Sequence, residues 1–123
     1  MAIRFDTALG LHAQALALRA ERTRILASNL ANETTPGYQA RDIDFAASLQ
    51  RALEEAATGS AGLLPGGAAE LLYRVPNHPS QDGNTVELGV EQAAFSQNAS
   101  DFQMSLTFIN MKLRGLAQAI EGQ

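Results

Sequence analysis

The chain has 123 residues, a formal net charge of -4 and a pI of about 5.0. This length fits one domain, and the acidic balance argues against nucleic acid as the main partner, because a phosphate backbone binds basic surfaces. Cysteine is absent, which excludes disulfides, thiolate catalysis and cysteine-ligated metal sites. Arg19, Arg22 and Arg24 cluster along the first predicted helix, and we interpret them as a solvated face because Glu21 lies among them.

Residues 6–32 are predicted to form one long helix. Its apolar and small residues recur in alternating steps of four and three, the spacing of a seam that faces a partner helix. This row consists of Leu9, Ala13, Leu16, Ala20, Thr23, Ala27 and Leu30. A second row, formed by Leu11, Ala15, Leu18 and Ile25, lies on a different side. Two rows predict two neighbours, or burial in a bundle.

The end of this helix carries the most informative segment of the chain, the four residues from Thr35 to Tyr38, which we name the joint. Pro36 disfavours a helical Thr35, and Pro36-Gly37 suits the centre of a type II turn with Gly37 at positive φ. Asn29 and Asn32 precede the joint. We expect these asparagines to fix the register between neighbouring subunits, since a buried amide tolerates few alignments.

Residues 33–57 are predicted to form the turn and then a short helix, from about Ile43 to Ala57, capped by Asp42 or Asp44. Residues 58–88 are rich in glycine and proline and predict a loop with at most one short strand or hairpin, near residues 71–75. Within this loop, Asp82-Gly83-Asn84 predicts a tight turn.

The last helix is predicted over residues 90–121, opened by Gly89 as its N-cap. It carries the strongest periodic signal in the chain, an unbroken row that steps by four and three. The row consists of Phe95, Ala99, Phe102, Leu106, Ile109, Leu113, Leu116 and Ile120. A second row, Met104, Phe108 and Met111, lies beside it.

These elements predict a mainly α fold in a single elongated domain spanning residues 1–123. The long N- and C-terminal helices pair as a coiled coil, and the short middle helix and the Gly/Pro-rich loop make the return. Such a pair leaves apolar surface exposed in a monomer, which marks an association site. The predicted assembly interface consists of Leu9, Leu16, Asn29, Leu30, Asn32, Phe95, Phe102, Leu106, Ile109, Leu113, Leu116 and Ile120. Periodicity alone leaves a compact monomeric three-helix bundle open as the alternative.

The sequence predicts no catalytic residue, no metal site and no cofactor. His12 and His78 have no carboxylate or serine at a diagnostic spacing, so we interpret them as solvent-facing or packing residues. Walker, dinucleotide-binding, nucleophile-elbow and zinc patterns are absent. The longest apolar runs are far shorter than the roughly 18 residues of a membrane span. Residues 8–18 are not read as a signal peptide, because His12 and Gln14 interrupt them.

The run from Ile25 to Tyr38, ILASNLANETTPGY, resembles the N-terminal signature of the bacterial flagellar axial proteins, which are the rod, hook and hook-associated subunits. Three further segments resemble the proximal rod subunits of that family. They are residues 39–45, residues 72–76 and the segment that opens with Asp82, Gly83, Asn84 and Thr85. The chain departs from the family pattern at Gly89, where an acidic residue is common, and at Phe102, where a tyrosine is common.

The resemblance implies a structural, non-enzymatic subunit of the proximal rod that assembles helically through its terminal helices. The partners that it implies are copies of itself, other rod subunits, the adaptor FliE, the MS ring and the export gate, with no nucleic acid and no direct membrane span. It also implies a location in the periplasmic rod of the basal body after export without a cleaved signal peptide. A soluble cytoplasmic coiled-coil adaptor or chaperone is the alternative, which would explain the heptads but not the joint.

Overall fold

The structure is a computed structural model that describes residues 5–58 and 69–122. Over these residues the element order is α1 (Phe5–Ala31), β1 (Arg41–Ile43), α2 (Phe45–Ala57), β2 (Leu71–Tyr73) and α3 (Leu88–Glu121). The predicted fold class is therefore confirmed: two long terminal helices, a short middle helix and one small hairpin. Residues 59–68 of the predicted glycine-rich loop lie outside the described residues.

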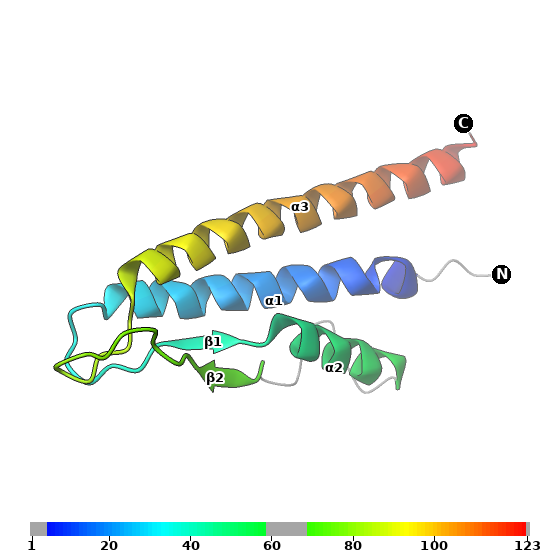
Figure 1. The fold of residues 1–123 in the computed structure, drawn as a ribbon. Coiled ribbons are helices and arrows are strands. Elements are labelled where there is room, and N and C mark those ends of the chain that lie inside the picture. The colour runs from blue at the N-terminus through cyan, green and yellow to red at the C-terminus, as the bar shows by residue number, and fades with distance from the viewer. Residues whose placement is uncertain (1–4, 59–68, 123) are drawn as a thin grey trace.

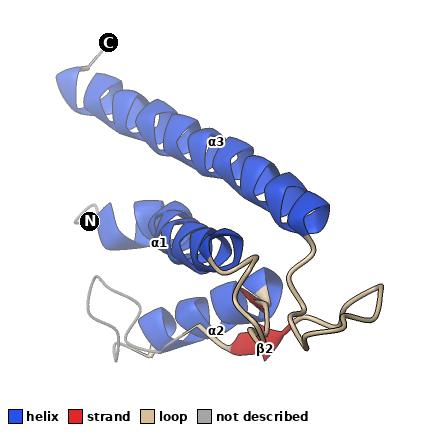
Figure 2. Ribbon diagram, turned by 90° about the vertical axis from the view of Figure 1, so that its left-hand side faces the viewer, coloured by secondary structure: helices blue, strands red, loops and turns tan. Residues whose placement is uncertain are grey.

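Helix α1 lies in the middle of the molecule. Figures 1 and 2 show α3 on one side of α1, with α2 and the hairpin on the opposite side, and α1 contacts α3, α2 and β1. This arrangement explains why α1 carries two apolar rows, because each row serves a different neighbour.

The second predicted row of α1 forms the compact core. Leu18 and Ile25 pack with Ile43 of β1, and Phe45 and Leu49 of α2 lie against this cluster. The seam row is covered less completely, since Ala13, Ala20 and Ala27 are exposed while Leu9, Leu16 and Leu30 are half-buried. The buried apolar cluster therefore joins α1 to α2 and β1, whereas the α1–α3 contact, which is the most extensive one that α1 makes, includes several polar side chains.

Helices α1 and α3 run antiparallel in a constant register. Asn29 meets Glu91, Thr23 meets Asn98, Arg19 meets Asp101 and His12 meets Phe108, so the residue numbers of each pair add to 120 or 121. Figure 1 shows that the two helices lie closest near the joint and diverge toward the two chain ends.

The helix starts differ from the sequence-based expectation. Asp44 caps α2 by accepting a hydrogen bond from the Ala47 amide at 3.1 Å, but Asp42 belongs to β1 and does not cap a helix. Helix α3 begins at Leu88 with Glu87 as its N-cap, so the expected cap at Gly89 is wrong. The Glu87 carboxylate accepts hydrogen bonds from Asn77 instead of bonding the first turn of its own helix.

The hairpin pairs β1 with β2 in antiparallel register, with Arg41 opposite Tyr73, Asp42 opposite Leu72 and Ile43 opposite Leu71. The sequence predicted the second strand and not the first. Because Arg41–Ile43 pair with β2, the short helix begins at Phe45, two residues later than expected.

Candidate functional site: the polar junction

The C-terminal end of α1, the hairpin and the segment that leads into α3 meet at one end of the helix pair. We name this region the junction. Its first part is the joint, where the Tyr38 amide donates to the Thr35 carbonyl at 3.3 Å and Gly37 has a φ of 74°. These two features match the predicted type II turn, and they redirect the chain from α1 into β1.

The Asp82–Thr85 segment docks directly on the joint. The Gly37 amide donates to the Asp82 carbonyl at 3.0 Å, and the Thr85 amide donates to the Tyr38 carbonyl at 2.9 Å. The Thr85 hydroxyl accepts a hydrogen bond from the Ala40 amide at 2.8 Å. Two segments that the sequence singled out separately are therefore parts of one structure.

Asn84 holds the turn that follows α1. Its side-chain amide nitrogen lies within hydrogen-bond distance of the carbonyls of Asn32, Glu33 and Thr35, at 3.0, 2.7 and 2.8 Å, and its oxygen accepts from the Val86 amide at 2.8 Å. These carbonyls belong to the segment between the end of α1 at Ala31 and the joint, where the chain leaves the helix. A buried side chain from more than 40 positions away supplies their partner.

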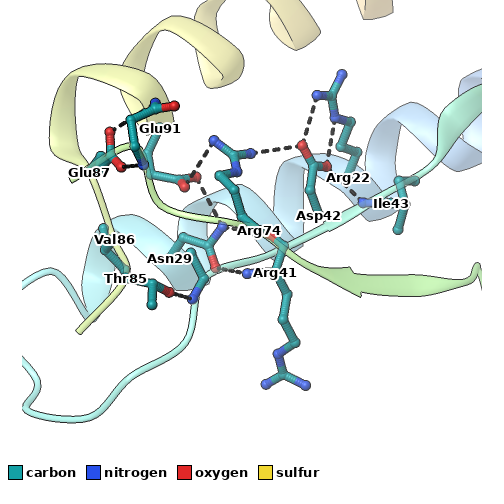
Figure 3. A network of polar contacts seen from close by, with 12 residues as sticks. Arg22, Asn29, Arg41, Asp42, Ile43, Arg74, Thr85, Val86, Glu87 and Glu91 are labelled. Carbon is teal, nitrogen blue, oxygen red and sulfur yellow. Dashed lines mark hydrogen bonds and ion pairs between the residues drawn. The ribbon is translucent and has the colours of Figure 1, made fainter. Parts of the chain in front are cut away.

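Asn29 is fully buried and is hydrogen-bonded within its own chain. Its amide nitrogen donates to the Arg41 carbonyl at 2.6 Å and to Glu91 Oε2 at 2.9 Å, and its oxygen accepts from the Arg41 amide at 3.1 Å (Figure 3). It thus occupies the place that a neighbouring peptide unit would take beside β1. Asn32 bonds locally to Ser28 and Thr35. Asn29 therefore aligns α1 with β1 and α3 within one chain. The sequence-based hypothesis had placed this role between neighbouring subunits.

An alternating chain of charges crosses the junction. Glu91, which is fully buried, has Oε1 3.1 Å from Arg74 Nη1, an ion-pair contact without hydrogen-bond alignment. Arg74 Nη2 also donates to Asp42 Oδ2 at 2.8 Å, and the Arg22 guanidinium holds both Asp42 oxygens at 2.9 Å (Figure 3). Glu91, Arg74, Asp42 and Arg22 therefore tie α3, the hairpin and α1 together.

The environment of Asp42 favours its charged form. Burial alone would raise the pKa of this carboxyl, but the Arg22 hydrogen bonds, the Ile43 amide and the charges of Arg22 and Arg74 lower it below its ordinary value. The same contact raises the pKa of Arg22. The pair is partly screened from water, which makes it stronger than an exposed pair.

A second polar cluster lies along the α1–α3 contact. Asn98 is buried and donates to the Arg19 carbonyl at 3.0 Å and to the Thr23 hydroxyl at 2.8 Å. The Arg19 guanidinium lies 3.3 Å from Asp101 and 3.6 Å above the centre of the Phe45 ring, and burial lowers its pKa.

The expected solvated arginine face is therefore wrong for two of its three members. Arg19 and Arg22 are only 16% and 20% exposed and hold α1 to its neighbours. Arg24 does lie in solvent, paired with Glu21.

The apolar positions predicted for assembly remain outside the junction. Along α3, Phe95, Phe102, Ile109 and Leu116 are half-buried. Apart from Leu88 at its start, the large apolar side chains of α3 that stay exposed are Met104, Leu106, Phe108, Met111, Leu113 and Ile120. The C-terminal half of α3 therefore presents apolar surface that the described part of the chain does not cover.

The described residues offer little for catalysis. No group of three or more metal-ligating side chains occurs among them, and no helix among them is long and apolar enough to cross a membrane. The His12 ring lies against the Phe108 ring, with centroids 5.9 Å apart and an angle of 30° between the planes, and His78 is exposed.

A family model described as flagella basal body rod protein matches residues 9–39, which cover most of α1 and the joint. The flagellar basal body rod protein FlgB of Cereibacter sphaeroides is 48% identical over 97% of this chain and 98% of its own length. The chain belongs to the FlgB family. FlgB of Salmonella typhimurium is 41% identical, over 97% of this chain and 96% of its own, and FlgB of Escherichia coli is 40% identical over 96% of each.

Membership of the FlgB family makes the protein a structural component of the flagellar basal body rod and not an enzyme. The residues that sequence reasoning missed in the junction are Arg22, Asp42, Arg74 and Glu91. Arg74 lies within the family-like segment 72–76, which was the one signal available for it. The pairing of Glu91 carried no sequence signal, because its partners lie 17 and 62 positions away.

Proposed function

We propose that this chain is a structural subunit of the proximal rod that assembles helically through its terminal helices. In this role it links the MS ring and the export gate to the rest of the rod, next to the adaptor FliE, and reaches the periplasm by export without a cleaved signal peptide. The observation that carries the proposal is the run of exposed apolar side chains on α3 beyond Phe102. An apolar surface of this kind marks a protein interface.

The junction supports the same proposal from the other end of the molecule. Most of its buried amides and charged side chains find their hydrogen-bond and ion-pair partners within the chain, so the junction does not need a second chain to keep its structure. The far halves of α1 and α3 diverge and keep apolar rows available (Figure 1). A subunit of this type presents long helical surfaces to its neighbours while the junction keeps the two helices in register.

The test replaces Leu106, Ile109 and Leu113 with glutamine. We expect loss of rod assembly and of swimming, while the purified variant keeps the junction, as judged by hydrogen exchange of the Asn84 and Glu91 amides. A matched control replaces Gln103, Asn110 and Gln118 of the same helix with alanine and should leave swimming intact. Normal swimming of the glutamine variant, or recovery of the wild-type chain from cytoplasm alone and never from basal bodies, would contradict the proposal.

A further inference from the structure

The two outer edges of the hairpin differ. The outer edge of β1 is closed by side chains: Asn29 bonds both the amide and the carbonyl of Arg41, and Asp42 Oδ1 accepts from the Ile43 amide at 2.8 Å. Strand edges normally need such protection, because their unpaired polar groups are a template for another strand.

The outer edge of β2 has no such protection among the described residues. The Arg74 amide donates to the Ala40 carbonyl, so in this register Asp42 and Leu72 form the next hydrogen-bonded pair. The main-chain polar groups of Leu71 and Tyr73 therefore point away from β1. The side chains of Leu71, Leu72 and Tyr73 are 44%, 46% and 66% exposed. In Figure 1, β2 lies on the side of the hairpin that faces away from α1 and α3.

We propose that β2 pairs with β2 of a second copy of this chain, antiparallel and about a two-fold axis at Leu72. Leu71 of each copy then exchanges both of its main-chain hydrogen bonds with Tyr73 of the other, which makes four bonds and a four-stranded sheet in the order β1-β2-β2-β1. The exposed leucine and tyrosine side chains cover one another in this sheet.

Charge complementarity selects a second copy as the occupant. In the segment from Glu70 to Arg74, an acidic residue is followed by three apolar residues and then by a basic residue. An antiparallel self-pairing centred on Leu72 places Glu70 of each copy opposite Arg74 of the other, so both ends of the contact carry opposite charges. Glu70 is half exposed and is the residue that reaches across, whereas Arg74 is 18% exposed, stays on Asp42 and Glu91 and presents only the remaining edge of its guanidinium.

This contact lies outside the terminal helices and does not depend on the proposed rod assembly. A two-fold contact closes on itself, whereas a helical rod needs head-to-tail contacts that propagate. The β2 pairing therefore belongs to the chain before it is built into a rod, and it covers the hairpin edge that residues 5–58 and 69–122 leave open.

The test uses the absence of cysteine from the chain. Leu72 of the two copies form a non-hydrogen-bonded pair, with Cα atoms about 4.5 Å apart, which suits a disulfide. We expect Leu72→Cys to form a disulfide-linked dimer under mild oxidation. The matched control is Val75→Cys, because Val75 is 85% exposed but would lie about 20 Å from its counterpart across the axis. We expect the Leu72→Cys dimer to form about tenfold faster than the Val75→Cys dimer on non-reducing gels.

Two further changes in the Leu72→Cys chain test the hydrogen bonds and the charges. Tyr73→Pro removes an amide that points outward, so it should leave the β1–β2 ladder intact and slow the trapping several-fold. Glu70→Lys places a lysine opposite Arg74 of the other copy, so the like charges should also slow the formation of the disulfide-linked dimer. Equal trapping of Leu72→Cys and Val75→Cys, or no effect of either added change in a chain whose circular dichroism is unaltered, would overturn the proposal.

Discussion

Three buried asparagines connect distant parts of the chain. Asn29, Asn84 and Asn98 are 0%, 7% and 1% exposed, and each donates to the main chain of another element. An amide suits this task because it carries donors and acceptors together and can match a peptide unit. Burial of such a group without partners is costly, so each asparagine fixes one alignment of the elements that it joins.

Asn84→Ala should destabilise the chain by about 2 kcal/mol, because it leaves carbonyls of the turn after α1 and the Val86 amide without their partner. Urea unfolding followed by circular dichroism measures this. Asn110→Ala, at an exposed position of α3, is the control and should change the stability by less than about 0.5 kcal/mol. Equal effects of the two substitutions would show that Asn84 does not hold this turn.

Asp42 should make the fold sensitive to acid. Its pKa is lowered in the folded chain, so its contribution to stability is present above about pH 4, the unfolded value, and is lost as the pH falls through the folded value. Asp42→Asn should therefore be less stable at neutral pH and should lose less stability on acidification. Urea midpoints of both chains at about pH 7 and about pH 3 test this. Parallel loss of stability in the two chains would contradict the assignment.

At the scale of elements, two glycines should respond oppositely to the same substitution. Gly89 lies in the first turn of α3 with ordinary helical φ and open space around its Cβ position, so Gly89→Ala should stabilise the chain by about 0.5–1 kcal/mol. Gly37 has a φ of 74°, so Gly37→Ala should cost about 1–2 kcal/mol. Thermal unfolding of both variants checks the signs, and a destabilised Gly89→Ala chain would argue against helix at this position.

The elements could be predicted from the sequence to the extent that local spacing determines them. The heptad rows predicted α1 and α3, and Pro36-Gly37 and Asp82-Gly83 predicted their turns, because each of these signals acts within a few residues. Strand β1 was missed because it has only three residues and two of them, Arg41 and Asp42, are charged. The start of α3 was misplaced because Glu87 is occupied by Asn77, a contact across the loop.

The junction itself could be predicted only in part. Asn29, the joint and Asp82–Thr85 were singled out as segments, but which of them touch depends on the path of the whole chain. Arg19 and Arg22 were misassigned to solvent for the same reason, since their carboxylate partners come from α3 and β1.

At the scale of the whole molecule, one connection between the three layers is the chain of ion pairs centred on Arg74. Arg74 contacts Glu91 of α3 and Asp42 of β1, and Asp42 in turn holds Arg22 of α1. This placement makes the position of the hairpin and the start of α3 dependent on each other. In Figure 1 the far half of α3 lies away from the hairpin. We therefore expect substitutions of Arg74 to destabilise the junction and to leave the exposed apolar side chains of α3 unchanged.

A double-mutant cycle tests this dependence. Arg74→Met leaves the fully buried Glu91 without its cation and should cost about 3–5 kcal/mol. Adding Glu91→Gln removes the uncompensated charge, so the double variant should be more stable than the sum of the single changes predicts, by about 1 kcal/mol or more. The exposed pair Arg51 and Glu70, 49% and 51% exposed, is the matched control, and Arg51→Met with Glu70→Gln should couple by less than about 0.5 kcal/mol. Urea unfolding gives the seven free energies, since the two cycles share the wild-type chain. Additive effects at Arg74 and Glu91 would mean that the hairpin and α3 are held together by packing and not by this ion pair.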